Sequence, residues 1–190
     1  DSLSVDRIHV VIGHGAEAVK ASISNDKITW VFQEQQAGTG HAVAQALPEI
    51  PDEAKVLVIY GDVPLIKRST LENLLRHVSQ KSLALLTVKM DDPTGYGRIV
   101  RDSSGFVTEI VEQKDASQEQ VGIKEVNTGI LAVQANLLKS WLPKLSNNNA
   151  QGEYYLTDII AMSVNEGMEV AVAYPENVQE VQGVNNRIQM

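Results

Sequence analysis

Residues 56–65 read VLVIYGDVPL, in which an unbroken apolar run at residues 56–60 is followed by Gly61 and Asp62. A second run of this kind, LALLTV, occupies residues 83–88. Strands that are covered by helices on both faces show such continuous apolar runs, whereas half-exposed strands alternate apolar and polar residues. We therefore expect both runs to lie deep in the sheet of an α/β protein. Asp62 then stands at the carboxyl end of a central strand.

Further strands and helices are expected on both sides of these runs. Apolar periodicity predicts strands at residues 8–12, 28–33, 126–133 and 169–173 and helices at residues 16–23, 42–47, 71–78, 137–145 and 154–164. Residues 98–101 and 106–111 flank a polar turn and predict a small antiparallel insertion. Alternating strands and helices predict a mixed, mainly parallel sheet with helices on both faces.

Composition narrows the class of protein. The chain has 190 residues, 43% of them hydrophobic and 21% charged, which are the values of one soluble globular domain. A net charge of −8 argues against nucleic acid as a partner, because the phosphate backbone would be repelled. The absence of cysteine excludes a disulfide framework and cysteine-ligated metals and fits the cytoplasm. No apolar run approaches the roughly 20 residues of a bilayer span, so we expect no contact with a membrane.

A glycine turn near the amino terminus opens one functional alternative. Residues 13–18 read GHGAEA, which fits G-x-G-x-x-A, and Glu34 closes the next strand about 20 residues later. This spacing is typical of a dinucleotide site, in which Gly13, Gly15 and Glu34 would serve an NAD(P)-linked oxidoreductase. Tight strand-to-helix turns in other α/β proteins also use glycine.

Two further loops carry chemistry. Residues 33–42 read QEQQAGTGHA and join a strand to a helix, where free N–H groups and glycine let a planar ring or an anion approach the backbone. The Gln33 amide could pair with a base edge, since it offers both a donor and an acceptor. Asp62 suits Mg²⁺, which takes one or two carboxylates plus substrate phosphates. Taken singly, these patterns also fit a capped turn and a turn-forming aspartate, and Asn127 fits a buried structural amide.

Taken together, the motifs resemble the bacterial N-acetylglucosamine-1-phosphate uridylyltransferases. The motifs that carry the resemblance are QAGTGHA at 36–42, YGDVPL at 60–65, DPTGYGRI at 92–99, VNTGI at 126–130, residues 147–155 and GVNNR at 183–187. The resemblance implies a Rossmann-like nucleotidyltransferase fold. It also implies transfer of a uridylyl group from UTP to N-acetylglucosamine 1-phosphate, which gives UDP-N-acetylglucosamine, a cell-wall precursor. A noncatalytic nucleotide-binding module remains the second alternative.

The resemblance also assigns roles to individual residues. Uracil is expected at Gln33, Gly38 and Thr39. The phosphates and the sugar are expected at Tyr60, Gly61 and Asp62. The N-acetylglucosamine is expected at Gly97, Glu112 and Asn127, with Tyr155 and Thr157 on the sugar side. Asp62 and Asn185 are the expected Mg²⁺ ligands and the catalytic pair.

The chain departs from this family in two respects. Residues 1–190 correspond to a single uridylyltransferase (pyrophosphorylase) domain without its first strand and its glycine-rich phosphate loop. The acetyltransferase β-helix domain, through which the resemblance implies a homotrimer, is also absent from this sequence. We therefore expect the chain to bind a sugar nucleotide but to show little turnover by itself. In this alignment the Gly13 turn follows the second strand, which weakens the dinucleotide alternative.

Overall fold

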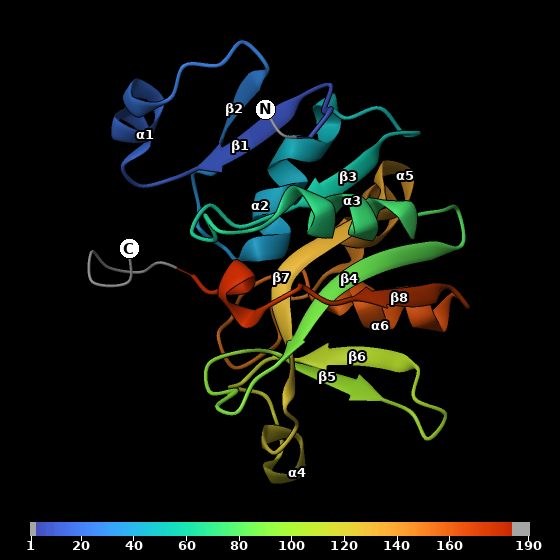
Figure 1. Cartoon of the computed structure of the whole chain (residues 1–190). Coiled ribbons are helices and arrows are strands. Elements are labelled where there is room, and N and C mark those ends of the chain that lie inside the picture. Colours follow the sequence, from blue (N-terminus) through green and yellow to red (C-terminus); the bar gives the residue numbers. More distant parts are fainter. Residues whose placement is uncertain (1–2, 184–190) are drawn as a thin grey trace.

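The fold combines two sheets with six α-helices in the computed structural model of the chain, which describes residues 3–183 (Figure 1). The strands are β1 Ile8–Ile12, β2 Ile28–Phe32, β3 Lys55–Val58, β4 Ser82–Lys89, β5 Arg98–Arg101, β6 Val107–Val111, β7 Glu125–Gln134 and β8 Glu169–Ala173. The helices are α1 Ala16–Ser22, α2 Thr39–Ala46, α3 Arg68–Arg76, α4 Gln118–Val121, α5 Ala135–Trp141 and α6 Asp158–Asn165, with 3₁₀ turns η1 Leu47–Glu49, η2 Leu142–Lys144 and η3 Val178–Val181.

The strands form an outer sheet and a main sheet. The outer sheet is the parallel pair β1–β2, and the main sheet has the order β6-β5-β7-β4-β8, with β3 also paired to β7. Within the main sheet, β4 and β8 are parallel, whereas β7 runs antiparallel to β3, β4 and β5. Helix α2 packs between the two sheets and contacts β1 and β2 (Figure 1).

Two hydrophobic cores lie on opposite faces of the main sheet. On one face, Leu83 and Leu85 of β4 pack in a core that also holds Trp141 of α5 and Ile160 of α6. On the other face, Ala84, Leu86 and Val88 pack in a core with Leu74 of α3. Alternate residues of one strand thus enter different cores, because successive side chains point to opposite faces. The prediction of a deep strand at residues 83–88 is confirmed.

The α/β class, the mixed sheet, the helices on both faces and the antiparallel hairpin β5–β6 are also confirmed. Parallel pairing within residues 3–183 is nevertheless confined to β1–β2 and β4–β8. The long strand β7 accounts for the difference, since it runs against three neighbours.

The expectation that residues 56–60 lie deep in the sheet is wrong. Strand β3 ends at Val58, and Ile59 and Tyr60 are 47% and 38% exposed. The reason is that β3 pairs with β7 alone in the described part of the chain, so its second edge lacks a covering strand.

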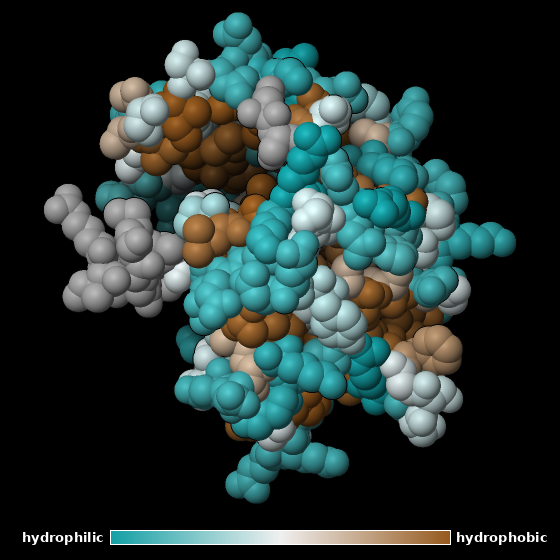
Figure 2. Space-filling view, viewed as in Figure 1, coloured by the Kyte–Doolittle hydropathy of each residue, from teal (hydrophilic) through white to brown (hydrophobic). Residues whose placement is uncertain are grey.

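Hydrophobic side chains line a hollow on the side of the molecule where β1 and β2 lie (Figure 2). The residues of these strands are mostly half-buried, and Phe32 is 59% exposed. Among residues 3–183, no helix combines the length and the hydropathy that a bilayer crossing requires.

Candidate functional site

The loop between β2 and α2 can only be built with glycine at position 38. Its φ angle is 107°, a region that side chains disfavour, and a Cβ on Gly38 would lie 2.7 Å from the carbonyl oxygen of Tyr154. The backbone of the loop is therefore closely packed on a second segment. That segment is residues 153–157, which precede α6.

Three hydrogen bonds join these two segments. The N–H of Tyr154 donates to the Ala37 carbonyl at 2.8 Å, and the N–H of Gly40 donates to the Tyr154 carbonyl at 2.8 Å. The N–H of Leu156 donates to Oγ1 of Thr39 at 3.1 Å. Residues 33–42, predicted to hold a base and called the base loop below, are thus attached to the segment that carries Tyr155 and Thr157.

The side chain of Gln33 is fixed from two directions. Its Nε2 lies 3.2 Å from the carbonyl oxygen of Gly38 and 2.9 Å from Nδ1 of His41. Gln33 is half-buried at the end of β2, beside an open pocket of about 630 Å³ that Gly13, Gly15 and Glu34 also line. The structure therefore brings together the residues of the dinucleotide pattern and one residue of the expected uracil site.

Tyr60 links the other expected residues. Its ring lies on Gly129 so closely that a Cβ there would be 2.0 Å from Cε2. Partial burial raises the pKa of Tyr60, and the negative charges of Glu112 and Asp62 raise it further, while a hydrogen bond with Thr39 lowers it. The phenol therefore stands within electrostatic range of both acids and contacts Thr39.

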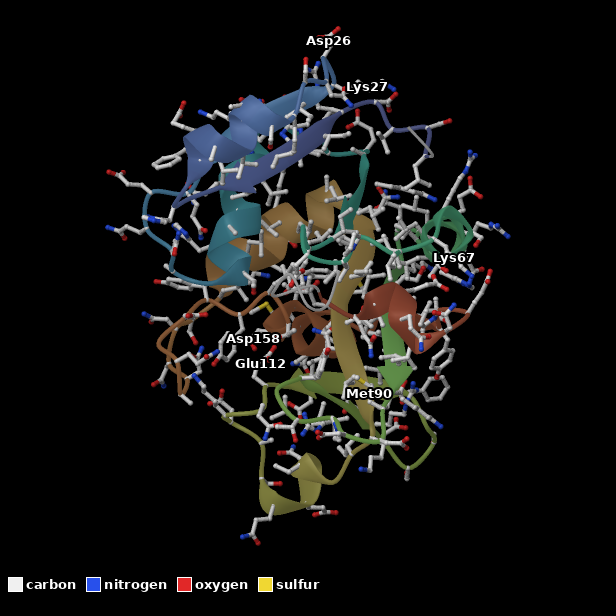
Figure 3. All side chains as sticks on the ribbon, turned by 60° about the vertical axis from the view of Figure 1, so that its left-hand side comes forward. Asp26, Lys27, Lys67, Met90, Glu112 and Asp158 are labelled. Atoms are coloured by element: carbon white, nitrogen blue, oxygen red, sulfur yellow. The ribbon has the colours of Figure 1, made fainter. Side chains whose placement is uncertain are left out.

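Glu112 lies at the end of β6 and faces the start of α6. The hydroxyl of Thr157 donates to Oε1 of Glu112 at 2.9 Å. Burial is the main cause that raises the pKa of Glu112, and the carboxylates of Asp158, Asp115 and Glu153 add to it. Figure 3 shows Glu112 and Asp158 next to one another, and burial together with Asp115 also raises the pKa of Asp158. These carboxylates form a partly dehydrated cluster in which each negative charge raises the pKa of its neighbours.

Asn127 and Gly97 meet at the adjacent strands. The N–H of Asn127 donates to the Gly97 carbonyl at 2.8 Å, and its Oδ1 accepts from the N–H of Gly129 at 3.0 Å. A Cβ on Gly97 would lie 2.9 Å from Cγ2 of Ile110 and 3.3 Å from Oε2 of Glu112, so Gly97 lies directly against that carboxylate. The Nδ2 group of Asn127 has no partner among residues 3–183 and can donate to a ligand.

Tyr155 points elsewhere. It is 7% exposed, and its hydroxyl donates to Oδ2 of Asp115 at 3.2 Å. Burial raises the pKa of Tyr155, and Asp115 adds to this. Its contact is therefore with the acid behind Glu112.

Asp62 is exposed and directly follows the exposed Gly61. Within residues 3–183 no group of three or more His, Cys, Asp or Glu side chains could hold a metal ion. A lone exposed carboxylate close to Tyr60 still fits Mg²⁺, which retains several waters and phosphate oxygens, and does not fit a zinc site. The second expected ligand, Asn185, lies outside the described residues.

Sequence patterns missed two kinds of partner. His41 belongs to the motif QAGTGHA, yet its contact with Gln33 depends on how the loop folds back. Asp115 and Asp158 come from separate segments and converge on Glu112 only in three dimensions. No local sequence pattern indicates either arrangement.

Comparisons with known proteins show which proteins this chain is similar to. Residues 1–125 match the family model of the MobA-like NTP transferase domain. The chain is 63% identical over 188 residues to the bifunctional protein GlmU of Marinobacter nauticus and 60% identical over 188 residues to that of Pseudomonas syringae pv. tomato. Both alignments cover 99% of this chain and 41% of the relative, so the chain spans about two fifths of their length.

Two solved structures share the fold. A UDP-glucose pyrophosphorylase complexed with UDP-glucose superposes with a TM-score of 0.71 at 16% identity, over 92% of this chain and 75% of that one. A putative glucose-1-phosphate thymidylyltransferase from Bacillus anthracis gives a TM-score of 0.67 at 19% identity, over 89% of this chain and 68% of that one. The nucleotidyltransferase fold expected from the sequence is confirmed.

Proposed function

We propose, from the premise that this chain belongs to the family of MobA-like NTP transferase domains, that the protein transfers a uridylyl group from UTP to N-acetylglucosamine 1-phosphate. The identity of 63% to a bifunctional GlmU supports this substrate pair over others in the family. The observation that carries the proposal is the position of Tyr60, which contacts Thr39 of the base loop and lies within electrostatic range of Asp62 and Glu112. This position of Tyr60 supports a single site for the expected base, phosphate and sugar residues.

In the proposed reaction, a phosphate oxygen of the sugar phosphate attacks the α-phosphorus of UTP. A new P–O bond forms, the bond between the α-phosphorus and the bridging oxygen breaks, and pyrophosphate leaves. Such a step depends on alignment and charge neutralisation more than on an acid–base pair. Gln33, Gly38 and Thr39 hold uracil, while Asn127, Glu112 and Gly97 hold the hexose.

Asp62 and Asn185 would hold Mg²⁺ in this scheme. When bound, the ion supplies positive charge to the phosphates. Glu112 acts differently: as a dehydrated carboxylate it accepts from a sugar hydroxyl or amide, and Thr157 keeps it in place. Tyr60, which contacts Thr39 and lies within electrostatic range of Asp62 and Glu112, would lie between the base and the sugar.

We extend the proposal to the setting of the reaction. UTP, N-acetylglucosamine 1-phosphate and UDP-N-acetylglucosamine are the proposed partners, Mg²⁺ is the cofactor, and the cytoplasm is the compartment. The whole protein is proposed to form a homotrimer. The dinucleotide alternative loses support, because the comparisons match nucleotidyltransferases.

The decisive test is Asp62→Asn in the full-length protein. The substitution removes a charge but little volume, so the fold should survive while uridylyl transfer falls at least about tenfold, or about 1.4 kcal/mol in the barrier. Asp26→Asn is the matched control, since Asp26 is an exposed acid in the turn before β2 (Figure 3). A rate above about a tenth of the parent, with Mg²⁺ dependence unchanged, would contradict the role of Asp62.

A binding measurement separates the proposal from its rivals. UDP-N-acetylglucosamine with Mg²⁺ should raise the melting temperature of the chain, whereas NAD at the same concentration should leave it unchanged. The opposite ranking would favour the oxidoreductase. Pyrophosphate exchange in the full-length protein distinguishes an enzyme from a noncatalytic module.

A further inference from the structure

The amide of Gln33 has both of its donors engaged. The Gly38 carbonyl can only accept, so the atom 3.2 Å from it must be the nitrogen of the amide. The same nitrogen lies 2.9 Å from Nδ1 of His41. Because two protons of Nε2 go to these two acceptors, Gln33 presents only its oxygen to a ligand. Oε1 has no hydrogen-bond partner among residues 3–183.

The tautomer of His41 follows from this arrangement. Nδ1 must be free of a proton in order to accept from Gln33, and the ring proton of the neutral imidazole then sits on Nε2. Nε2 lies 3.2 Å from Nε2 of Gln45, which also donates to the His41 carbonyl at 3.3 Å. The Gln45 side chain is exposed, and if its amide turns over it gives up that bond and brings its oxygen to the ring proton. The ring of Tyr154 lies nearby, with its centroid 6.4 Å from that of His41 and the two planes tilted by 31°.

An oxygen at this position discriminates between pyrimidines. Uracil has a donor at N3 and an acceptor at O4, whereas cytosine has an acceptor at N3 and a donor at N4. The N–H of Gly38, which belongs to the same loop, is also free of partners in the described part of the chain. An acceptor from Gln33 and a donor from Gly38 match the N3–H and O4 of uracil. They oppose the N3 and N4 groups of cytosine.

We infer that His41 is a positioning residue that fixes the Gln33 amide with its oxygen toward the base and thereby selects uracil over cytosine. This inference rests on the proposed function, because it takes Gln33 to be part of the base site. His41 does not touch the nucleotide. Without the Nδ1 acceptor, only the 3.2 Å hydrogen bond to the Gly38 carbonyl holds the Gln33 amide. The turned-over amide, which offers its NH₂ group to N3 of cytosine, is then populated more often.

Full-length protein carrying His41→Leu tests the inference. Leucine keeps the volume of the side chain but offers no acceptor, so the ratio of kcat/KM for UTP to that for CTP should fall about tenfold, the effect of one mispaired hydrogen bond. His41→Asn should restore most of the ratio, because Oδ1 of asparagine is as far from Cβ as Nδ1 of histidine. Gln45→Leu removes the polar neighbour of Nε2 and should leave the ratio unchanged.

A double substitution separates positioning from a structural effect. In a Gln33→Ala background no amide remains to be oriented, so His41→Leu should no longer change the ratio. A change of equal size in both backgrounds would overturn the inference, as would an unchanged ratio in His41→Leu alone. If the parent protein itself fails to prefer UTP, the proposed function fails first.

A spectroscopic measurement needs no variant. The ¹⁵N chemical shifts of histidine-labelled full-length protein report which ring nitrogen carries the proton. The expected tautomer has an unprotonated Nδ1 and a protonated Nε2. A protonated Nδ1 would overturn the inference even if His41→Leu does not fold.

Discussion

The outer and main sheets differ sharply in how they are stabilised. In β7 all ten residues are buried, and in β4 seven of eight are, whereas Ile12 is the single buried residue of β1 and β2. A two-stranded sheet cannot shield both of its faces, and isolated strand pairs are marginal in water. The two halves of the proposed site therefore rest on supports of different strength.

This difference has a functional meaning. Glu112, Asn127 and Gly97 lie on or beside the main sheet, while Gln33 follows β2 of the outer sheet. The base loop compensates through its hydrogen bonds to residues 153–157, which belong to the main body. We therefore expect rigid recognition of the sugar and a base side that depends on a few specific contacts.

The largest expected contrast is between one substitution in each sheet. Leu85→Ala empties a fully buried position of the main sheet and should lower the free energy of unfolding by about 3 to 5 kcal/mol. Val31→Ala in β2 removes half-buried methyl groups and should cost about 1 kcal/mol. Urea denaturation of both variants measures the two values. Equal losses would mean that the outer sheet is packed as firmly as the main sheet.

A smaller effect is expected where the ring of Tyr60 meets the main sheet. Gly129→Ala places a Cβ against that ring and a side chain at φ 79°, so it should destabilise the protein by about 2 to 3 kcal/mol. In a Tyr60→Ala background the collision disappears, and about 1 kcal/mol of backbone strain should remain. Thermal or urea unfolding of the parent, the two single variants and the double variant gives the coupling energy between Gly129 and Tyr60. Strict additivity would show that the ring moves aside without cost.

The smallest effect concerns Glu112 and its neighbouring carboxylates. The pKa of Glu112 is raised in the folded protein, chiefly by burial, so the folded state holds the proton more tightly than the unfolded chain does. The cost of the charge is then fully present above the folded pKa and is lost as the pH falls below the unfolded value. Glu112→Gln should therefore raise the melting temperature slightly at pH 8, and this gain should vanish near pH 4.

The outer sheet supplies the control for that measurement. Glu34 is an exposed acid just after β2. Glu34→Gln should change the free energy of unfolding by no more than about 0.5 kcal/mol, the scatter of surface substitutions, and leave the melting temperature nearly unchanged at both pH values. If Glu112→Gln lowers the melting temperature at pH 8, the contacts of the carboxylate outweigh its burial. The same variant should weaken use of the sugar phosphate in the full-length protein.

Much of the fold was predictable because its apolar patterns are local. Residues 8–12 and 169–173 form strands with the expected bounds, and residues 83–88 are buried as expected. The helix expected at 154–164 begins only at Asp158, since Tyr154 and Leu156 are used in hydrogen bonds to the base loop. The helix expected at 137–145 instead runs over Ala135–Trp141 and gives way to a 3₁₀ turn at Pro143.

One short helix escaped prediction altogether. Residues 118–121 are too polar for apolar periodicity, but Ser117 and Gln120 form a capping box that starts α4. The directions of β3 and β5 relative to β7 are long-range properties that no local pattern encodes.

The site shows the same division between local and distant information. Gly38 and Gly97 are recognisable as glycines in loops, yet only the structure shows what a side chain would strike there, Tyr154 in one case and Glu112 in the other. The roles of the individual site residues remain predictions. Substrate kinetics of the variants described above will decide them.

The outer sheet has only two strands in the described residues, and this affects how the isolated chain behaves in solution. The segment ITWVF of β2 is β-branched and aromatic, carries no charge and no proline, and pairs with β1 on one side only in the described residues. An exposed edge of this kind can pair with a strand of another chain. Strand β3 contains the charged residue Lys55, which opposes such pairing, whereas β2 contains no charged residue. Concentrated solutions of the chain should therefore self-associate through β2, and Val31→Lys should keep the chain monomeric in sedimentation experiments.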